Sequence, residues 1–237
     1  LLLATGGGFW TSEASAADHR VPIGAVIPDL KFTDIRALHR SLSELGDCQA
    51  VVLTFTTTDC PLVRRYLPRL GELATRYHPQ NVMFLAVNVG ANDTVRMMAA
   101  QAVDIESPLI FVKDYDLSCA RAVGVTRTPE VVVLDSLGTL RYRGRIDDQF
   151  RIGGTRPAAS RADLDIAIEE VLGQKPVTVA ETQADGCVIT APTEIPLPSE
   201  VTWSSSIAAS AICACWRSPS WSSTCEGCSP DGRDQST

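Results

Sequence analysis

Two apolar patterns alternate along the first half of the chain. Residues 50–56 (AVVLTFT) form a short β-branched run after the turn-like Gly46–Asp47, which predicts a buried strand. The apolar positions that follow are spaced by three and four, which predicts a helix with one apolar face. These positions are Leu62, Tyr66, Leu70, Leu73 and Tyr77. A strand that runs into an amphipathic helix is the repeating unit of α/β domains.

The same alternation continues as far as residue 123. Residues 81–89 (NVMFLAVNV) predict a second strand, and Asn92–Asp93 is a cap sequence for a helix that runs to Val103. Residues 108–112 predict a third strand, and residues 116–123 predict a short helix. Each apolar strand is therefore followed by a helical segment.

A hairpin and a last helix complete the pattern. The apolar runs 131–134 and 139–142 flank the turn sequence Ser136–Leu137–Gly138, which predicts two antiparallel strands. Ser160 is predicted to cap a helix whose apolar stripe runs from Leu164 to Leu172. The order β-α-β-α-β-α-β-β-α predicts an α/β domain with a mixed central sheet and helices on both faces.

The two ends of the chain differ from this middle part. Residues 1–20 pass from Leu1–Leu2–Leu3 through an apolar stretch to the small-residue triplet Ala14–Ser15–Ala16, which is typical of the end of a secretory signal peptide. A disordered arm is the alternative. We take these residues as a signal peptide remnant, which indicates an exported protein, periplasmic or otherwise extracytoplasmic.

The C-terminal third contains two further segments. Residues 174–201 follow the predicted domain of residues 21–173, and their Pro, Thr and Val content predicts an extended strap that lies on it. Residues 202–237 hold three of the four Trp, four of the eight Cys and ten Ser without a helical or strand period. We assign this tail no fold.

Composition and charge narrow the class of protein. Hydrophobic residues make up 45% of the 237 residues and charged residues 21%, close to the globular average. No apolar stretch reaches the roughly 20 residues that a membrane-spanning helix needs, so the chain is not expected to span a membrane. The formal net charge of −7 argues against nucleic acid as a partner, because nucleic acid selects for clustered Lys and Arg.

Metal and haem sites are not predicted. The three histidines have no metal-ligand spacing. Cys225 and Cys228 form a C-x-x-C, but Ser229 stands where a c-type haem site has His, and no second pair lies at zinc-finger spacing. Export would permit disulfides among the eight cysteines, and their connectivity stays open at this point.

Cys60 is the candidate reactive centre. It lies between the first predicted strand and its helix, and Pro61 occupies the first helical position that proline prefers. A thiol at this place faces free backbone N–H groups and the positive end of the helix dipole, to which Arg64 and Arg65 can add. Both favour the thiolate, which is the nucleophilic form of cysteine. A buried, inert cysteine is the alternative.

The segment around Cys60 resembles a known family. Thr57–Thr58–Asp59–Cys60–Pro61 resembles the T-x-x-C-P of peroxiredoxins, and thioredoxins carry C-x-x-C at the same place in their fold. Residues 23–30 and the segment Thr128–Pro129–Glu130 are similar to the redoxin group of the alkyl hydroperoxide reductase and thiol-specific antioxidant family.

Three later segments extend this resemblance. Residues 143–149 (RGRIDDQ) look like the R-G-R-I-D-D-Q-[FY] run of bacterial exported redoxin-domain proteins. Residues 161–164 and 186–189 are similar to the later R-x-D-L helix and G-C-[LV]-I segment of the same proteins. The resemblance covers about residues 21–189.

The resemblance implies a thioredoxin fold for residues 21–173. Pro129 would be the cis-proline that faces the active cysteine, and Thr128 the residue whose backbone could pair with a bound peptide or substrate. Thr57 would be the threonine of the peroxiredoxin motif. The alternative for Pro129 is an ordinary trans proline at a strand start.

Two departures from the pattern affect the expected cycle of Cys60. Val63 stands where thioredoxins have their second cysteine, and Leu53 stands where peroxiredoxins have a proline. Cys60 would therefore be oxidised to a sulfenic acid that an outside thiol reduces, or would use a distant resolving cysteine. Cys187 on the strap is the preferred partner and Cys119 the second. For each, an unpaired structural thiol is the alternative.

Two charged groups near these motifs have open roles. Arg127 could approach Cys60 and stabilise a thiolate or a peroxide oxygen, or could form a surface ion pair. Asp147 and Asp148 are adjacent acids, and neighbours on a strand point to opposite faces. They are therefore expected to cap or turn the chain rather than to act as a catalytic or metal-binding pair.

Two functions are compatible with these observations. The first is a thiol-dependent oxidoreductase, in which Cys60 attacks a peroxide or a protein disulfide and an external thiol reduces the enzyme again, with no cofactor. The second is a non-catalytic thioredoxin-fold binding module that partners an electron-transfer protein. The ionisation of the Cys60 thiol separates the two.

Overall fold

Strand β3 (Ala50–Thr56) and helix α1 (Pro61–Tyr77) form the centre of the molecule, as the apolar pattern predicts. All seven residues of β3 are buried. The five apolar positions that predicted α1 are buried too, so one face of the helix packs against the sheet. The structure is a computed structural model that describes residues 20–105 and 108–190.

The central sheet is mixed, as predicted. Its seven strands lie in the order β2-β1-β5-β4-β3-β7-β8. β3 pairs parallel with β4 and β4 with β5, whereas the remaining pairs are antiparallel. The other strands of this sheet are β1 (Lys31–Asp34), β2 (His39–Ser41), β4 (Val82–Asn88), β5 (Ile110–Lys113), β7 (Glu130–Asp135) and β8 (Leu140–Gly144).

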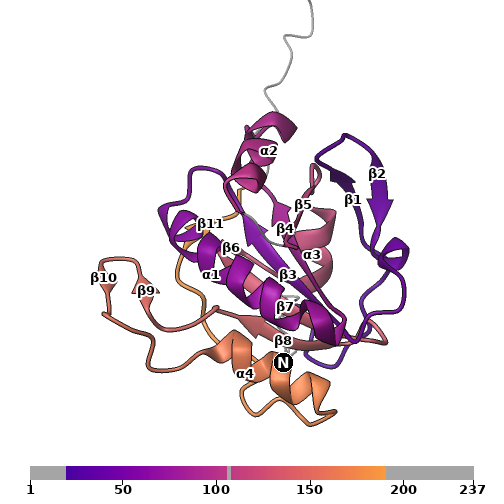
Figure 1. Cartoon of the computed structure of the whole chain (residues 1–237), viewed down its shortest axis with the longest axis vertical. Coiled ribbons are helices and arrows are strands. Elements are labelled where there is room, and N and C mark those ends of the chain that lie inside the picture. The colour runs from indigo at the N-terminus through magenta and orange to yellow at the C-terminus, as the bar shows by residue number, and fades with distance from the viewer. Residues whose placement is uncertain (1–19, 106–107, 191–237) are drawn as a thin grey trace, which may run out of the picture. The chain divides into compact units, whose positions relative to one another are not determined.

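Helices cover both faces of this sheet (Figure 1). Successive side chains of a strand point to opposite faces, and those of β3 divide accordingly between two apolar clusters. Val52 belongs to the α1 core, which α1, α2 (Val95–Val103) and α4 (Asp163–Leu172) cover. Val51 and Leu53 belong to the α3 core, under α3 (Ser118–Val123). The predicted thioredoxin-like arrangement is confirmed.

Two predicted helix caps are wrong. The side chain of Thr94 accepts the Met97 N–H at 3.3 Å and caps α2, because the carboxylate of Asp93 is directed elsewhere. Helix α4 begins at Asp163 with Ala162 as its N-cap. Ser160 lies outside it, and its N–H donates to Asp148 Oδ1 at 2.7 Å.

Several short elements were not predicted. The β1–β2 hairpin adds two strands at one edge of the sheet. Two further pairs lie outside it, β9 (Phe150–Arg151) with β10 (Gly154–Thr155) and β6 (Arg127–Thr128) with β11 (Cys187–Val188). Single 3-10 turns occur at Leu42–Leu45 and His78–Gln80. The β6–β11 pair brings the predicted strap onto the domain.

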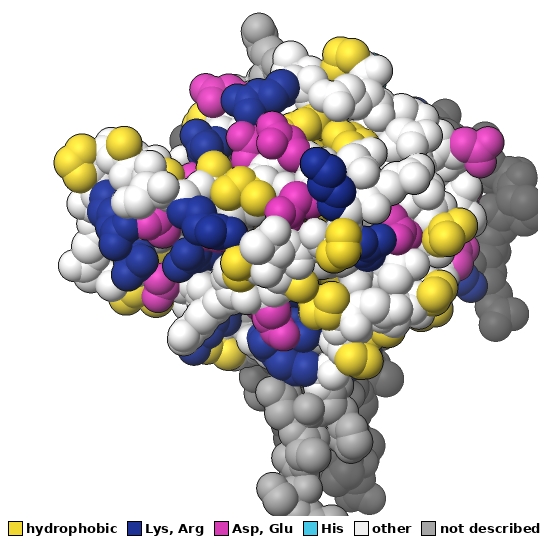
Figure 2. Space-filling model, turned by 90° about the horizontal axis from the view of Figure 1, so that it is seen from below, with side chains coloured by type: hydrophobic (Ala, Val, Ile, Leu, Met, Phe, Trp, Pro, Cys, Tyr) yellow, Lys and Arg dark blue, Asp and Glu magenta, His cyan; other side chains and the backbone are white. Residues whose placement is uncertain are grey.

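Charged side chains of both signs are intermixed on the lower face of the molecule (Figure 2). Basic side chains gather at the end that carries β9 and β10. Within the described residues no helix is long and apolar enough to cross a membrane. The predicted signal remnant before Arg20, the last residues of the strap (191–201) and the tail (202–237) lie outside the part of the chain that the structure describes.

Candidate active site

Cys60 occupies the N-cap position of α1, with Pro61 at the first helical position. Its backbone is extended (φ −67°, ψ 118°), so the chain passes directly from the loop after β3 into the helix. Within the part of the chain that the structure describes, Cys60 makes no side-chain cap hydrogen bond, but the Leu62 and Val63 N–H groups, which no helical carbonyl can accept, help to lower the pKa of its thiol. The sequence therefore places a thiol where backbone dipoles favour negative charge.

The Thr128–Pro129 peptide lies next to this sulfur. The bond is cis, as the resemblance implied. The Cys60 thiol donates to the Thr128 carbonyl oxygen at 3.3 Å, and its side chain is only 2% exposed. Thr128 itself is buried, and its hydroxyl has no hydrogen-bond partner among the described residues. Residues about 70 positions apart in sequence thus form one site around the sulfur.

Cys187 of the strap lies directly over Cys60. Its thiol donates to Cys60 Sγ with a sulfur-to-sulfur distance of 3.0 Å. The antiparallel pairing of β11 with β6 sets Cys187 opposite Thr128 and Val188 opposite Arg127. Both cysteines are free thiols in this structure, and Cys187 is exposed whereas Cys60 is buried. The two sulfurs can therefore join with little movement of the backbone.

The two thiols have opposite ionisation tendencies. Burial opposes ionisation of Cys60, but the hydrogen bond from the Cys187 thiol and the nearby backbone N–H groups of α1 outweigh it and lower the pKa of Cys60. The hydrogen bond to Cys60, aided by burial, raises the pKa of Cys187 to about 11. Of the two thiols, Cys60 is therefore the one that loses its proton more readily.

The opposite pKa shifts of the two thiols predict how the alkylation rate of Cys60 depends on pH. We expect the alkylation rate of Cys60 to titrate below the ordinary thiol value of about 8.5, because only the thiolate reacts. Cys187→Ala removes an S–H donor to the thiolate and is expected to raise the pKa of Cys60, which moves the alkylation midpoint to higher pH. Alkylation followed by mass spectrometry from pH 5 to pH 10 measures both midpoints.

Cys119→Ala is the matched control for this titration and should leave the midpoint of Cys60 unchanged. An identical midpoint in the native protein and in Cys187→Ala would contradict the assignment of Cys187 as the hydrogen-bond donor.

The strap lies very close to the cis-proline loop. A Cβ at Gly186 would lie 2.1 Å from the Thr128 carbonyl oxygen, so only glycine fits there. The Arg127 guanidinium donates to the Gly186 carbonyl at 3.0 Å, and the Ile189 N–H donates to the Thr126 carbonyl at 2.9 Å. Arg127 is thus directed to the strap that carries Cys187, and the structure shows no hydrogen bond from it to Cys60 among the described residues.

The RGRIDDQ run supplies the other anchor of the strap. The Arg143 guanidinium is 2% exposed and donates to Glu181 Oε1 at 2.7 Å and to the Val21 and Val123 carbonyls. Gly144 has φ +154°, and a Cβ there would lie 2.1 Å from the Thr182 hydroxyl. The most distinctive motif of the sequence therefore holds the strap in place.

Asp147 and Asp148 turn and fix the chain, as expected. Asp147 accepts from the Tyr66 hydroxyl at 2.6 Å and pairs with Arg69 at 3.0 Å. Asp148 accepts the Ser160 N–H and pairs with Arg156. The two carboxylates thus point to different partners, and no cluster of metal-ligating side chains is present within the described residues.

A buried polar network holds the loop before Cys60, and the sequence did not reveal it. The Asp93 carboxylate accepts the Thr58 N–H at 2.7 Å and also the Thr58 hydroxyl. Asn88 donates to Asp93 at 2.7 Å and accepts from the buried Lys113 ammonium at 2.7 Å. The network joins the ends of β3, β4 and β5 to the loop.

Thr57 is not a member of this network. The structure gives its hydroxyl no hydrogen bond among the described residues, and Thr58 makes the side-chain contacts of the loop instead. Thr57, the threonine of the peroxiredoxin motif, is thus the sequence neighbour of Thr58, the threonine that hydrogen-bonds to Asp93.

Cys119 and Cys48 do not meet Cys60. Cys119 lies in the α3 core, whereas Cys60 lies in the α1 core on the opposite face of the sheet. Its thiol donates to the Lys31 carbonyl at 3.2 Å, and burial raises its pKa to about 12. Burial also raises the pKa of Cys48, which packs against the α3 core. Of the two predicted resolving cysteines, the structure brings only Cys187 to the site.

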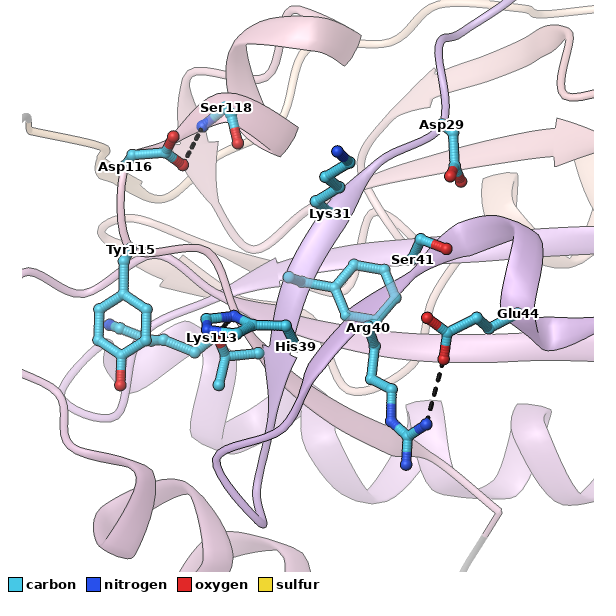
Figure 3. Close-up of a pocket in the computed structure, with 12 residues that line it drawn as sticks. Asp29, Lys31, His39, Arg40, Ser41, Glu44, Lys113, Tyr115, Asp116 and Ser118 are labelled. Carbon is cyan, nitrogen blue, oxygen red and sulfur yellow. Dashed lines mark hydrogen bonds and ion pairs between the residues drawn. The ribbon is translucent and has the colours of Figure 1, made fainter.

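A groove on the surface lies away from the two cysteines. It has a volume of about 590 Å³ between the β1–β2 hairpin and the β5–α3 connection (Figure 3). Basic and acidic side chains line it in mixed order, and Arg40 pairs with Glu44 at 3.1 Å. Lys113 reaches it from the polar network, but neither Cys60 nor Cys187 is among its lining residues. Cys60 thus lies under the strap, next to Cys187, and not in this groove.

Comparisons with known proteins place the chain in a family. Residues 23–158 match the Redoxin family. No match was found among curated proteins.

Solved structures show the same fold. A hypothetical protein from Sinorhizobium meliloti is 26% identical with a TM-score of 0.65, over 72% of this chain and 95% of the other. An uncharacterized conserved protein from Geobacillus kaustophilus is 25% identical with a TM-score of 0.66, over 73% and 93% of the two chains. A protein from Chlorobium tepidum, provisionally named thiol:disulfide interchange protein DsbE, is 20% identical with a TM-score of 0.52, over 65% and 99%.

Proposed function

Since the chain belongs to the Redoxin family, we propose that it is a thiol–disulfide oxidoreductase whose reactive pair is Cys60 and Cys187. The family supports thiol oxidoreductase chemistry in general. The observation that carries the specific assignment is the 3.0 Å distance between the two sulfurs, one at a helix start and the other on the strap.

The proposed cycle uses the asymmetry of the pair. The Cys60 thiolate attacks one sulfur of a substrate disulfide, forms a mixed disulfide and releases the other substrate sulfur as a thiolate. Cys187 then loses its proton and attacks Cys60 Sγ, which closes the Cys60–Cys187 disulfide and releases the second substrate thiolate. Because the negative charge of Cys60 disappears in the first step, the main cause of the raised pKa of Cys187 disappears with it.

A small peroxide is the second candidate substrate. Cys60 is 2% exposed under the strap, so a small oxidant fits the site better than a bulky one. In this reaction Cys60 attacks the O–O bond, becomes a sulfenic acid and releases an alcohol or water. Cys187 then condenses with the sulfenic acid to give the same disulfide and one water molecule. An external dithiol closes either cycle, and no cofactor takes part.

The geometry favours this activity over a non-catalytic binding module. A module that captures an extended peptide beside Thr128 needs a free strand edge there, and the chain's own β11 occupies that edge of β6. We further propose that the protein acts outside the cytoplasm, on the basis of the signal-like pattern of residues 1–20.

Peptide mapping tests the proposed pair. We expect mild oxidation with one equivalent of hydrogen peroxide or of an oxidised dithiol to produce one dominant disulfide, between Cys60 and Cys187. Digestion at low pH and mass spectrometry, with and without reduction, identify it. Because Cys119 lies in the other core, it should stay alkylatable once the protein is unfolded. A dominant disulfide that lacks Cys60 would refute the proposed pair.

A further inference from the structure

The two cysteines of the reactive pair differ in their exposure to solvent. Cys60 is 2% exposed, whereas Cys187 is exposed and so is its neighbour Val188 at 62%. β11 covers β6 on one side and has no second strand partner among the described residues. The strap therefore leaves Cys187 exposed at its edge and keeps Cys60 beneath it.

We propose that an external thiol reductant attacks the Cys60–Cys187 disulfide at Cys187. This inference rests on the proposed function, because it needs that disulfide to form. It adds which sulfur receives the reductant, and hence that the docking surface for a reducing partner is the outer side of the strap and not the start of α1.

The closeness of the strap to the cis-proline loop supports attack at Cys187 rather than at Cys60. Gly186 lies against the Thr128–Pro129 peptide with no room for a side chain, and the Cys187 pairing occupies the backbone of Thr128. A reductant that approached Cys60 would have to displace these contacts. One that approaches Cys187 meets an exposed residue and leaves the strap in place.

The chemistry of the leaving sulfur agrees with the geometry. A reductant thiolate bonds to Cys187 Sγ while the bond to Cys60 Sγ breaks, and Cys60 leaves with the electron pair. That sulfur lies at the N-terminus of α1, where the free N–H groups and the helix dipole favour negative charge, so the departing charge is stabilised where it forms. The second thiolate of the dithiol then attacks its own sulfur in the mixed disulfide, becomes oxidised and releases Cys187, which takes up a proton.

The mixed disulfide can be trapped with glutathione, which has one thiol and cannot complete the second step. The oxidised native protein is mixed with a small excess of glutathione, quenched with acid within seconds, alkylated and mapped by mass spectrometry. We expect glutathione on Cys187 and the alkyl group on Cys60, in at least a tenfold excess over the reverse labelling.

The outcomes of this experiment are distinct. Glutathione on Cys60, or in similar amounts on both cysteines, would overturn the inference and leave the proposed pair intact. Absence of the Cys60–Cys187 disulfide before glutathione is added would overturn both.

Val188→Asp gives a second measurement, because a carboxylate beside Cys187 should slow reduction by anionic glutathione by about two- to fivefold. Leu137→Asp, at a remote turn where the side chain is 79% exposed, should leave the rate unchanged, and an equal effect of both substitutions would count against attack at Cys187.

Discussion

Cys60→Ser is expected to lose at least about a thousandfold in turnover of peptide disulfides and of hydrogen peroxide. A serine hydroxyl stays protonated at neutral pH and is a weak nucleophile, whereas the thiolate of Cys60 carries both proposed reactions. Cys187→Ser should keep the first step and release one substrate thiol per protein molecule, and then stop. Single-turnover and steady-state assays with dithiothreitol separate these two results.

Cys119→Ser is the matched control for these variants. Its thiol is as buried as that of Cys60 but belongs to the other core, so turnover should stay within about twofold of the native rate. Full activity of Cys60→Ser would contradict the catalytic assignment, and multiple turnover by Cys187→Ser would show that an outside thiol resolves Cys60.

Arg143→Leu is expected to destabilise the protein by roughly 3 kcal/mol. The buried guanidinium satisfies the Val21 and Val123 carbonyls as well as Glu181, and its removal leaves buried acceptors without donors. This expected loss of stability lies at the lower end of the range for removing one partner of a buried ion pair, because Glu181 is 43% exposed and stays hydrated. Urea unfolding measures the free energy, and the midpoint temperature should fall by about 6–12 °C.

Arg76→Leu is the matched control. Arg76 pairs with Asp165 at 3.0 Å, but its side chain is 55% exposed, so the expected loss is below about 1 kcal/mol. Equal losses in the two variants would contradict the anchoring role of Arg143. Arg143→Leu should also loosen Cys187 from Cys60, which slower formation of the disulfide would show.

The sequence predicted those elements whose apolar pattern is long. β3 extends over seven residues and α1, with its apolar face, over 17, and both lie where the pattern placed them. β1 and β2 have four and three residues and bury only part of their side chains, so neither gives a readable period. Their strand structure depends on pairing with β5 and with each other.

The two cap errors have a common cause. Asp93 and Ser160 are residue types that cap helices, but each makes a hydrogen bond to a partner distant in sequence. Asp93 accepts from Thr58, 35 residues away, and the Ser160 N–H donates to Asp148, 12 residues away. Local sequence shows the capping capacity of a side chain and cannot show which partner the fold supplies.

The same reasoning explains which residues of the site could be predicted from the sequence and which could not. Cys60 and Pro129 lie in local motifs, and the reach of the strap indicated Cys187. The Asp93–Asn88–Lys113 network has no local signature, because its members come from the ends of different strands that only the parallel sheet brings together. Arg127 was expected near Cys60, and only the pairing of β6 with β11 reveals its contact with Gly186.

The two sulfurs of the pair are separated by 127 positions along the chain. A crosslink between them would enclose most of the domain in one covalent ring, which restricts the unfolded chain far more than the folded one. In the chain-entropy treatment, a ring of this size stabilises the native state by up to about 5 kcal/mol. Oxidation in the proposed cycle would thus also make the protein more resistant to heat, and reduction would remove that protection.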